Sequence, residues 1–94
     1  MEKWKWFVYI IECQDGLYYT GMTYNIQKRL EQHSSGLGSK FTAKHGFKDL
    51  KYCEEFNNIT EARQREVQLK DFIRKKKEAL WNYPSNDSEK LNPI

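Results

Sequence analysis

The feature that most constrains the fold is a run of apolar, β-branched and aromatic residues at positions 6–11, with the sequence WFVYII. The run is too short for a stable helix, and the turn-forming sequence QDG follows it at 14–16, so it predicts a β-strand. Residues 17–20 predict a second short strand, and the two strands form a β-hairpin. A chain of 94 residues has room for one small domain, and this hairpin would form its first part.

The length of the loop at 14–16 decides which hairpin residues share a face. A three-residue loop with its glycine in the left-handed conformation pairs Cys13 with Leu17. That register places Tyr9 and Tyr19 on one face of the hairpin. A two-residue loop shifts the register by one residue and separates the two tyrosines, because side chains alternate along a strand. The sequence leaves both registers open.

The rest of the chain predicts helices and one more strand. In chain order these are a helix over 26–34 with Asn25 as N-cap, a short helix over 39–45, a strand over 50–56, and a long helix over 61–80 with Thr60 as N-cap. Asn and Thr are favoured at N-caps because their side-chain oxygens accept hydrogen bonds from free amides of the first turn. We therefore expect one α+β domain over residues 1–81. A flexible tail should follow over 82–94, which contains both prolines and few apolar residues.

A carboxylate interrupts the apolar stripe of the long helix. At about 100° per residue, four residues form this stripe: Ala62, Leu69, Ile73 and Leu80. Glu66 falls among them, although glutamate is rarely buried unless it is paired or coordinated. One interpretation is a metal-binding or catalytic carboxylate at the edge of a cleft. The other is a glutamate at the margin of the stripe that pairs with Lys70, a contact worth about 0.2–0.5 kcal/mol.

Positive charge is concentrated in two segments. Residues 28–51 and residues 63–78 each carry a net charge of +4, whereas the whole chain carries +3. This distribution suits a nucleic acid lying across two basic elements, although a solvated lysine-rich helix face would have the same composition. The candidate nucleic-acid-binding residues are Lys28, Lys40, Lys44, Arg74, Lys75, Lys76 and Lys77.

Several classes of protein are disfavoured. The longest apolar run is far shorter than the roughly 20 residues that span a bilayer, and the N-terminus lacks the features of a signal peptide. We therefore expect a cytoplasmic protein without a membrane segment. Cys13 and Cys53 lie 40 residues apart without a Cys-x-x-Cys pair, which predicts two buried free thiols. Dinucleotide, P-loop and serine-hydrolase motifs are absent from the sequence.

Five ionisable side chains are candidates for chemistry: Tyr9 and Tyr19 on the hairpin, Arg29 and His33 on the helix 26–34, and Glu66. Arg29 and His33 follow Ile26 by three and seven residues, so they border the apolar stripe of their helix. This set suits metal-assisted cleavage of a phosphodiester, in which a carboxylate holds the ion and an arginine neutralises phosphoryl charge. A tyrosine acts as the base only if nearby cations such as Arg29 lower its pKa from about 10.

The order of these residues resembles a known family. The chain contains FVY at 7–9, YTG at 19–21, an arginine and a histidine on the next helix, and a distant helical glutamate. Over residues 6–74 this order resembles the GIY-YIG nuclease superfamily. The length and the sequence GSKFT at 38–42 are most similar to its short stand-alone bacterial members, an uncharacterised protein family. The resemblance implies a small three-stranded antiparallel sheet flanked by helices.

The resemblance also implies a role for each candidate residue. Glu66 would hold a single Mg²⁺ or Mn²⁺ ion, and Arg29 would stabilise the phosphate. Tyr9 would act as general base or position the attacking water, and Tyr19 would help to orient water or phosphate. His33 matches a histidine that assists proton transfer in some branches of the superfamily.

The chain departs from the family pattern in two respects. Phe7, Val8 and Thr20 replace a glycine and two isoleucines of the motifs, which removes no reactive group. The larger relatives carry an additional DNA-recognition domain, for which 94 residues have no room. The expected protein therefore cleaves with little sequence choice, needs a protein partner or a structured substrate, or has kept the fold without useful turnover.

Three functions follow from these observations. The leading hypothesis is a metal-dependent endonuclease acting on DNA, with structured or repair intermediates as substrates. The second is a non-catalytic nucleic-acid-binding module that uses the basic residues. The third is a protein-interaction adaptor in which Trp4, Trp6 and Trp81 form an exposed apolar patch. The sequence does not specify an oligomeric state.

Overall fold

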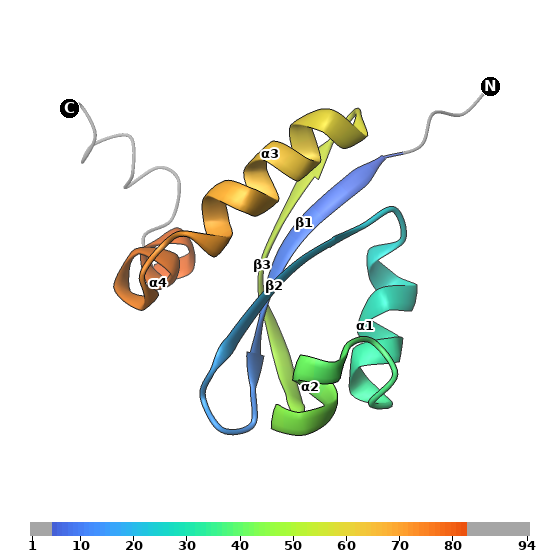
Figure 1. Cartoon of the computed structure of the whole chain (residues 1–94), viewed down its shortest axis with the longest axis vertical. Helices are drawn as coiled ribbons and strands as arrows, with labels where there is room; N and C mark the ends of the chain where they lie inside the picture. The colour runs from blue at the N-terminus through green and yellow to red at the C-terminus, as the bar shows by residue number, and fades with distance from the viewer. Residues whose placement is uncertain (1–4, 83–94) are drawn as a thin grey trace.

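The computed structural model describes residues 5–82 and contains one three-stranded antiparallel sheet with helices on both faces (Figure 1). Strand β1 (Trp6–Cys13) is central, between β2 (Tyr18–Thr23) and β3 (Phe47–Phe56). The expected α+β fold with three antiparallel strands is therefore confirmed. The predicted tail covers residues 82–94. Asn82 is the last residue of the last helix, and residues 83–94 lie outside the described residues.

The hairpin between β1 and β2 has the three-residue loop. The Cys13 amide donates a hydrogen bond to the Leu17 carbonyl at 2.7 Å, and Gly16 adopts a φ of 89°. In this register Tyr9 and Tyr19 lie on the same face of the sheet, with their ring centroids 6.4 Å apart. The sequence alone left this register open because either loop length satisfies the turn chemistry.

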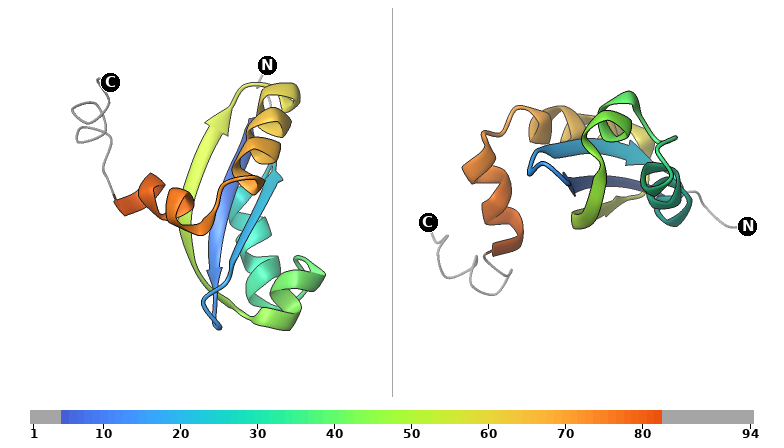
Figure 2. Two further views of the ribbon diagram at one scale, coloured as in Figure 1. Left: turned by 60° about the vertical axis from the view of Figure 1, so that its left-hand side comes forward. Right: turned by 90° about the horizontal axis from the view of Figure 1, so that it is seen from below.

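The central strand is buried on both faces, which explains its continuous apolar run. On one face Val8 and Ile10 pack against Ala62 and Leu69, and all four are fully buried. Helices α3 (Ile59–Lys70) and α4 (Arg74–Asn82) cover this face. Helices α1 (Ile26–Ser34) and α2 (Lys40–His45) lie on the other face, as Figures 1 and 2 show from three directions.

Local capping signals place α1 and α2 as expected. The Asn25 side chain accepts a hydrogen bond from the Lys28 amide at 3.1 Å, which confirms the predicted N-cap of α1. Ser39 caps α2 in the same way, and Gly46 with a φ of 79° follows its last residue. Strand β3 starts at Phe47, three residues before the predicted start at 50, because its pairing with β1 continues to Cys13.

The prediction of one long helix over 61–80 was wrong. Two helices occupy this segment, and the first begins with Asn58 rather than Thr60 as its N-cap. The amides of Asp71 and Phe72 both bond to carbonyls three residues back, at 3.1 Å, which tightens the end of α3. No glycine or proline marks this break, so the sequence contained no local signal for it.

The break changes which residues reach the core. Ile73, predicted on the buried stripe, is 71% exposed, whereas the neighbouring Phe72 packs against the core. Trp6 and Trp81 also pack against this core instead of forming an exposed patch, and Trp4 lies outside the described residues. These positions remove the main structural support for the adaptor hypothesis.

The prediction of two buried thiols was half right. Both cysteines are free, but only Cys13 is buried, and Cys53 is exposed. The exposure of the two thiols differs because Cys13 lies on the central strand β1, whereas Cys53 lies on the edge strand β3. Within residues 5–82, the helices are all too short or too polar to cross a membrane.

Candidate functional site

Tyr9 occupies the centre of the candidate site. Its side chain extends from the central strand and is only 1% exposed. Directly opposite on β2 stands Gly21, where a Cβ atom would lie 2.6 Å from the Tyr9 hydroxyl oxygen. A side chain at position 21 would therefore displace the Tyr9 hydroxyl, so the glycine of the second motif makes room for the tyrosine of the first.

His33 contacts the Tyr9 hydroxyl from helix α1. The His33 Nε2 atom lies 2.8 Å from the Tyr9 oxygen, and the ring is 1% exposed. Its other nitrogen, Nδ1, lies 2.7 Å from the Thr42 hydroxyl of α2. Tyr19 packs beside the same imidazole, with ring centroids 5.3 Å apart. His33 is therefore buried at the sheet surface, whereas the sequence placed it only at the border of the helix stripe.

Burial keeps both members of the Tyr9–His33 pair neutral near pH 7. It lowers the pKa of His33 to about 4, and the charge of Arg29 acts in the same direction. It also raises the pKa of Tyr9 well above its usual value, an effect to which Tyr19 and Glu66 add and which Arg29 opposes. Arg29 acts in the expected direction, but the net lowering of the Tyr9 pKa that a tyrosine base requires is absent, because desolvation outweighs the Arg29 charge.

Arg29 links the site to the loop before α2 and to a small surface hollow. Its Nη1 donates a hydrogen bond to the Gly38 carbonyl at 3.3 Å. The hollow has a volume of about 130 Å³, and its lining residues are Thr23, Tyr24, Asn25, Lys28, Arg29 and Gln32. Two adjacent cations in a polar lining suit an anionic group of about the size of a phosphate.

Glu66 approaches Tyr9 from the other side of the sheet. It lies on α3, which packs over β1 and β2, between the buried residues Ala62 and Leu69. Its side chain is 16% exposed, and Oε2 lies 3.2 Å from the Lys70 ammonium. The carboxylate is thus partly buried, paired as one interpretation expected, and close enough for its charge to raise the pKa of Tyr9.

Glu66 is a lone carboxylate rather than part of a ligand cluster. Within residues 5–82, no three His, Cys, Asp or Glu side chains gather around one point. This arrangement is unsuited to zinc, which takes three or four protein ligands. It fits Mg²⁺, which keeps several waters and is often bound by one or two carboxylates together with substrate phosphates.

The predicted nucleic-acid-binding residues lie on two sides of the molecule. Lys28 lines the hollow beside Arg29, and Lys40 and Lys44 are exposed on α2. The other four lie on α4, which packs on the opposite face of the sheet (Figure 1). The seven residues therefore do not form one continuous surface.

The cations of α4 differ in the contacts that they make within the protein. Arg74 donates to the Gly16 carbonyl at 2.7 Å, and its guanidinium lies 4.3 Å from the centre of the Tyr18 ring. Lys76 lies over the ring of Phe72 at 4.3 Å, and burial lowers the pKa of Lys77. Lys75 is exposed. Arg74 in particular has a structural role that competes with phosphate binding.

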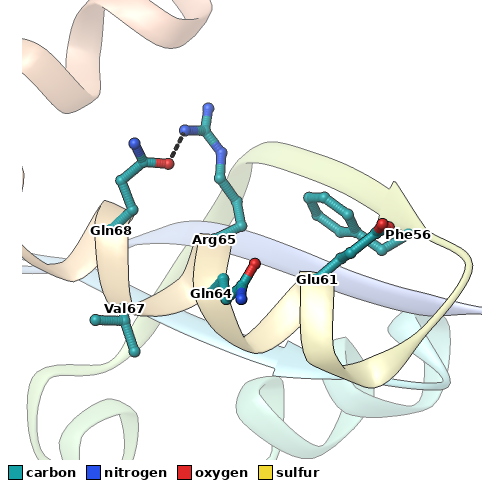
Figure 3. Close-up of a pocket in the computed structure, with 6 residues that line it drawn as sticks. All are labelled: Phe56, Glu61, Gln64, Arg65, Val67 and Gln68. Carbon is teal, nitrogen blue, oxygen red and sulfur yellow. Dashed lines mark hydrogen bonds between the residues drawn. The ribbon is translucent and has the colours of Figure 1, made fainter.

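A second hollow lies along α3, away from the tyrosines. It has a volume of about 520 Å³, and Figure 3 shows the residues that line it: Phe56, Glu61, Gln64, Arg65, Val67 and Gln68. Arg65 is engaged there by Glu54 at 2.8 Å and by Gln68 at 2.6 Å. Because the Arg65 guanidinium is already paired and no candidate residue lines this hollow, it does not contribute to the site.

Sequence reasoning missed Thr42 and Ser39. Thr42 is 1% exposed and contacts His33, and the Ser39 hydroxyl lies 2.9 Å from the Thr42 hydroxyl. Both residues belong to the sequence GSKFT, which was singled out only for its resemblance to relatives. The N-cap preference of Ser39 was the one local signal, and it pointed to helix α2 rather than to His33.

Comparison with known proteins shows which family the chain resembles. Residues 5–79 match the model of the GIY-YIG catalytic domain. A UPF0213 protein of Halobacterium salinarum is 43% identical over 74 residues, which cover 79% of this chain and 96% of the relative. A UPF0213 protein of Bacillus cereus is 45% identical over 78 residues, which cover 83% and 81% of the two chains. The solution NMR structure of a UPF0213 protein from Bacillus halodurans superposes with a TM-score of 0.54 at 37% identity, covering 94% of this chain and 97% of the other.

Proposed function

Since this chain belongs to the GIY-YIG catalytic-domain family, we propose that it is a metal-dependent endonuclease that hydrolyses phosphodiester bonds in DNA. The observation that carries the proposal is the surroundings of the Tyr9 hydroxyl. His33 bonds to this hydroxyl at 2.8 Å and Tyr19 packs beside it, while the charge of Arg29 acts on it from the α1 face of the sheet and that of Glu66 from the α3 face. An anionic substrate and a water nucleophile can be held around such a point.

The neutral Tyr9–His33 pair can receive a proton from water. A buried tyrosine with a raised pKa is not a phenolate at rest, so it cannot remove a proton alone. It can accept the proton of an attacking water while passing its own proton to His33, whose Nε2 is within hydrogen-bond distance. Arg29, beside the polar hollow, would offset the charge that builds on the phosphoryl oxygens.

Glu66 would hold the metal ion. Its single, partly exposed carboxylate suits Mg²⁺ or Mn²⁺ completed by water and by the substrate phosphate. When bound, the ion would supply a Lewis acid that polarises the phosphate and stabilises the leaving oxygen. Lys70, which pairs with Glu66 in the structure, would have to release the carboxylate.

DNA is proposed as the substrate because positive charge surrounds the site. Lys28 lines the hollow with Arg29, and Lys40 and Lys44 stand on the exposed side of α2. Phosphate contacts of this kind position a duplex without reading its sequence. The substrate class that suits such contacts is therefore defined by shape, as in branched or damaged repair intermediates.

The Lys70 contact favours a second candidate. If Glu66 serves only to pair with Lys70, the chain is a nucleic-acid-binding module that keeps the nuclease fold without catalysis. Such a module would bind DNA with steep salt dependence and equally well in the presence of a chelator.

A metal titration followed by amide NMR shifts distinguishes these candidates. We expect Mg²⁺ or Mn²⁺ to perturb the amides around Glu66, Tyr9 and Arg29 in the native protein. The perturbation should vanish in Glu66→Gln and persist in the matched control Glu61→Gln, an exposed carboxylate in the first turn of the same helix. If the same shifts appear in Glu66→Gln, the proposed metal ligand is wrong.

A further inference from the structure

We propose that Thr42, supported by Ser39, is a positioning residue that holds His33 in the tautomer with its proton on Nδ1, so that Nε2 accepts the hydroxyl proton of Tyr9. The geometry is a continuous chain of polar atoms. The Tyr9 oxygen lies 2.8 Å from His33 Nε2, and His33 Nδ1 lies 2.7 Å from the Thr42 hydroxyl. The Ser39 hydroxyl lies 2.9 Å beyond, from Thr42.

One of the two tautomers leaves a buried donor without an acceptor. With the proton on Nε2, His33 donates to the Tyr9 oxygen, and the Tyr9 hydrogen needs another acceptor. Among residues 5–82, His33 is the hydrogen-bond partner of this hydroxyl, and Tyr9 is 1% exposed. In the resting site the hydrogen would therefore lack a protein acceptor among residues 5–82, an arrangement that folded proteins avoid for buried polar groups.

The other tautomer gives Tyr9, His33 and Thr42 an acceptor each. Tyr9 donates to Nε2, and Nδ1 donates to the Thr42 oxygen. The Thr42 hydroxyl then donates to Ser39, either to its hydroxyl at 2.9 Å or to its carbonyl at 3.4 Å. The Ser39 oxygen has lone pairs for this bond and for the Thr42 amide, which donates to it at 3.0 Å.

The loop before α2 fixes the position of Thr42. Ser39 is the N-cap of α2, so its bond to the Thr42 amide sets the first turn of that helix. Gly38 lies directly against the imidazole, where a Cβ atom would collide with Nδ1. Arg29 donates to the Gly38 carbonyl and ties the loop to α1. These contacts hold Thr42 at one end of the ring and leave the other end to Tyr9.

The consequence for catalysis rests on the proposed function. As the oxygen of the attacking water bonds to phosphorus, one water proton moves to the Tyr9 oxygen and the Tyr9 proton moves to His33 Nε2. The bond from phosphorus to the leaving oxygen breaks, and that oxygen takes a proton from solvent. The imidazolium then returns its proton through Tyr9 to solvent. A ring already protonated on Nε2 could not take part, so Thr42 would set the direction of proton transfer.

The tautomer can be measured without any assay of cleavage. Long-range ¹H–¹⁵N spectra of the whole protein at pH 7 distinguish a protonated from an unprotonated ring nitrogen. We expect the proton of His33 on Nδ1 in the native protein and in Thr42→Ser. In Thr42→Val, which keeps the shape but removes the hydroxyl, population should move to the Nε2–H form. The signals of His45, which pairs with Asp15, should stay unchanged in both variants.

A native His33 protonated on Nε2 overturns the proposal, and so does a Thr42→Val protein with the native tautomer. If Thr42→Val does not fold, the native spectrum and that of Thr42→Ser still decide. On a cleavable DNA, Thr42→Val should lower kcat by about 10- to 100-fold and leave KM unchanged, with Thr42→Ser close to the native rate. The loss is a part of the roughly 100- to 10,000-fold that general acid–base catalysis contributes, because Thr42 only positions the base. If the native protein cleaves no DNA, the proposed function fails while the tautomer result still stands.

Discussion

Tyr9 and His33 are two ionisable side chains that the fold places against each other in a water-poor site, and desolvation dominates the protonation of both. The pKa of Tyr9 is raised and that of His33 is lowered to about 4, although Arg29 is close to both. Desolvation disfavours the charged form of either group, phenolate or imidazolium. At the residue scale the site is therefore a neutral hydrogen-bonded pair that can accept a proton, and Tyr9 is not a phenolate at rest.

The sequence singled out these residues as candidates but could not give their protonation. Their order along the chain made Tyr9, Tyr19, Arg29, His33 and Glu66 the candidate site residues. How deeply each is buried depends on which helix covers which face of the sheet, and this is a tertiary property. Thr42 was missed for the same reason, because its contact with His33 depends on how the loop before α2 folds.

The buried His33 should make stability depend on pH. Its pKa is about 4 when folded and 6.5 as the reference value for an unfolded chain. Between these values the unfolded chain binds a proton that the folded protein does not, so the free energy of unfolding falls as pH falls from about 6.5 to about 4. At pH 5 we expect a loss of about 2 kcal/mol relative to pH 7 from this group.

Urea unfolding at pH 7 and pH 5 checks this prediction. The native protein should lose about 2 kcal/mol more unfolding free energy between pH 7 and pH 5 than His33→Gln does, because only the native protein contains the buried imidazole. An equal loss of stability in native protein and His33→Gln would contradict the assigned protonation.

At the scale of elements, the sequence predicted the helix starts and turns that depend on neighbouring residues, but not the helix break that depends on packing against the sheet. Asn25 and the turn at 14–16 act through their own neighbours, and both features appear where the sequence placed them. The end of α3 has no such signal, since Asp71 and Phe72 form a tight turn without glycine or proline. The turn is favoured because it brings Phe72, Leu80 and Trp81 onto the sheet.

A pair of substitutions tests the two-helix arrangement. Phe72→Ala should lower the free energy of unfolding by about 2 kcal/mol, less than for a fully buried phenylalanine because Phe72 is only partly buried. Ile73→Ala should change it by less than about 0.5 kcal/mol, because Ile73 is 71% exposed. One continuous helix with Ile73 in the core predicts the reverse order. Urea denaturation of both variants distinguishes the two arrangements.

On the scale of the whole molecule, the basic residues divide between two sides of the sheet. Lys28, Lys40 and Lys44 surround the side that contains His33 and Arg29, and α4 carries its cations on the other (Figure 1). A net charge of +3 attracts DNA to either side. The proposed site requires the α1 and α2 side to make the phosphate contacts.

The salt dependence of DNA binding should therefore distinguish Lys44 from Arg74. Lys44→Ala should reduce the slope of log affinity against log salt by about one, the value for one lost phosphate contact. Arg74→Ala should leave the slope nearly unchanged and lower thermal stability instead, because Arg74 bonds to Gly16 and stacks on Tyr18. Anisotropy titrations of a short labelled duplex at several salt concentrations measure both slopes. A larger change in slope for Arg74→Ala would place DNA on α4.

The central claim is that Tyr9, His33, Arg29 and Glu66 form one metal-dependent site for phosphodiester hydrolysis. The most direct test is the Mg²⁺-dependent cleavage rate of flap, four-way-junction and single-stranded DNA by the native protein, Glu66→Gln and the control Glu61→Gln. We predict cleavage that stops in chelator, falls by roughly a thousandfold in Glu66→Gln, as expected for losing several kcal/mol of Lewis-acid stabilisation, and continues in Glu61→Gln. Cleavage by Glu66→Gln at the native rate would contradict the account.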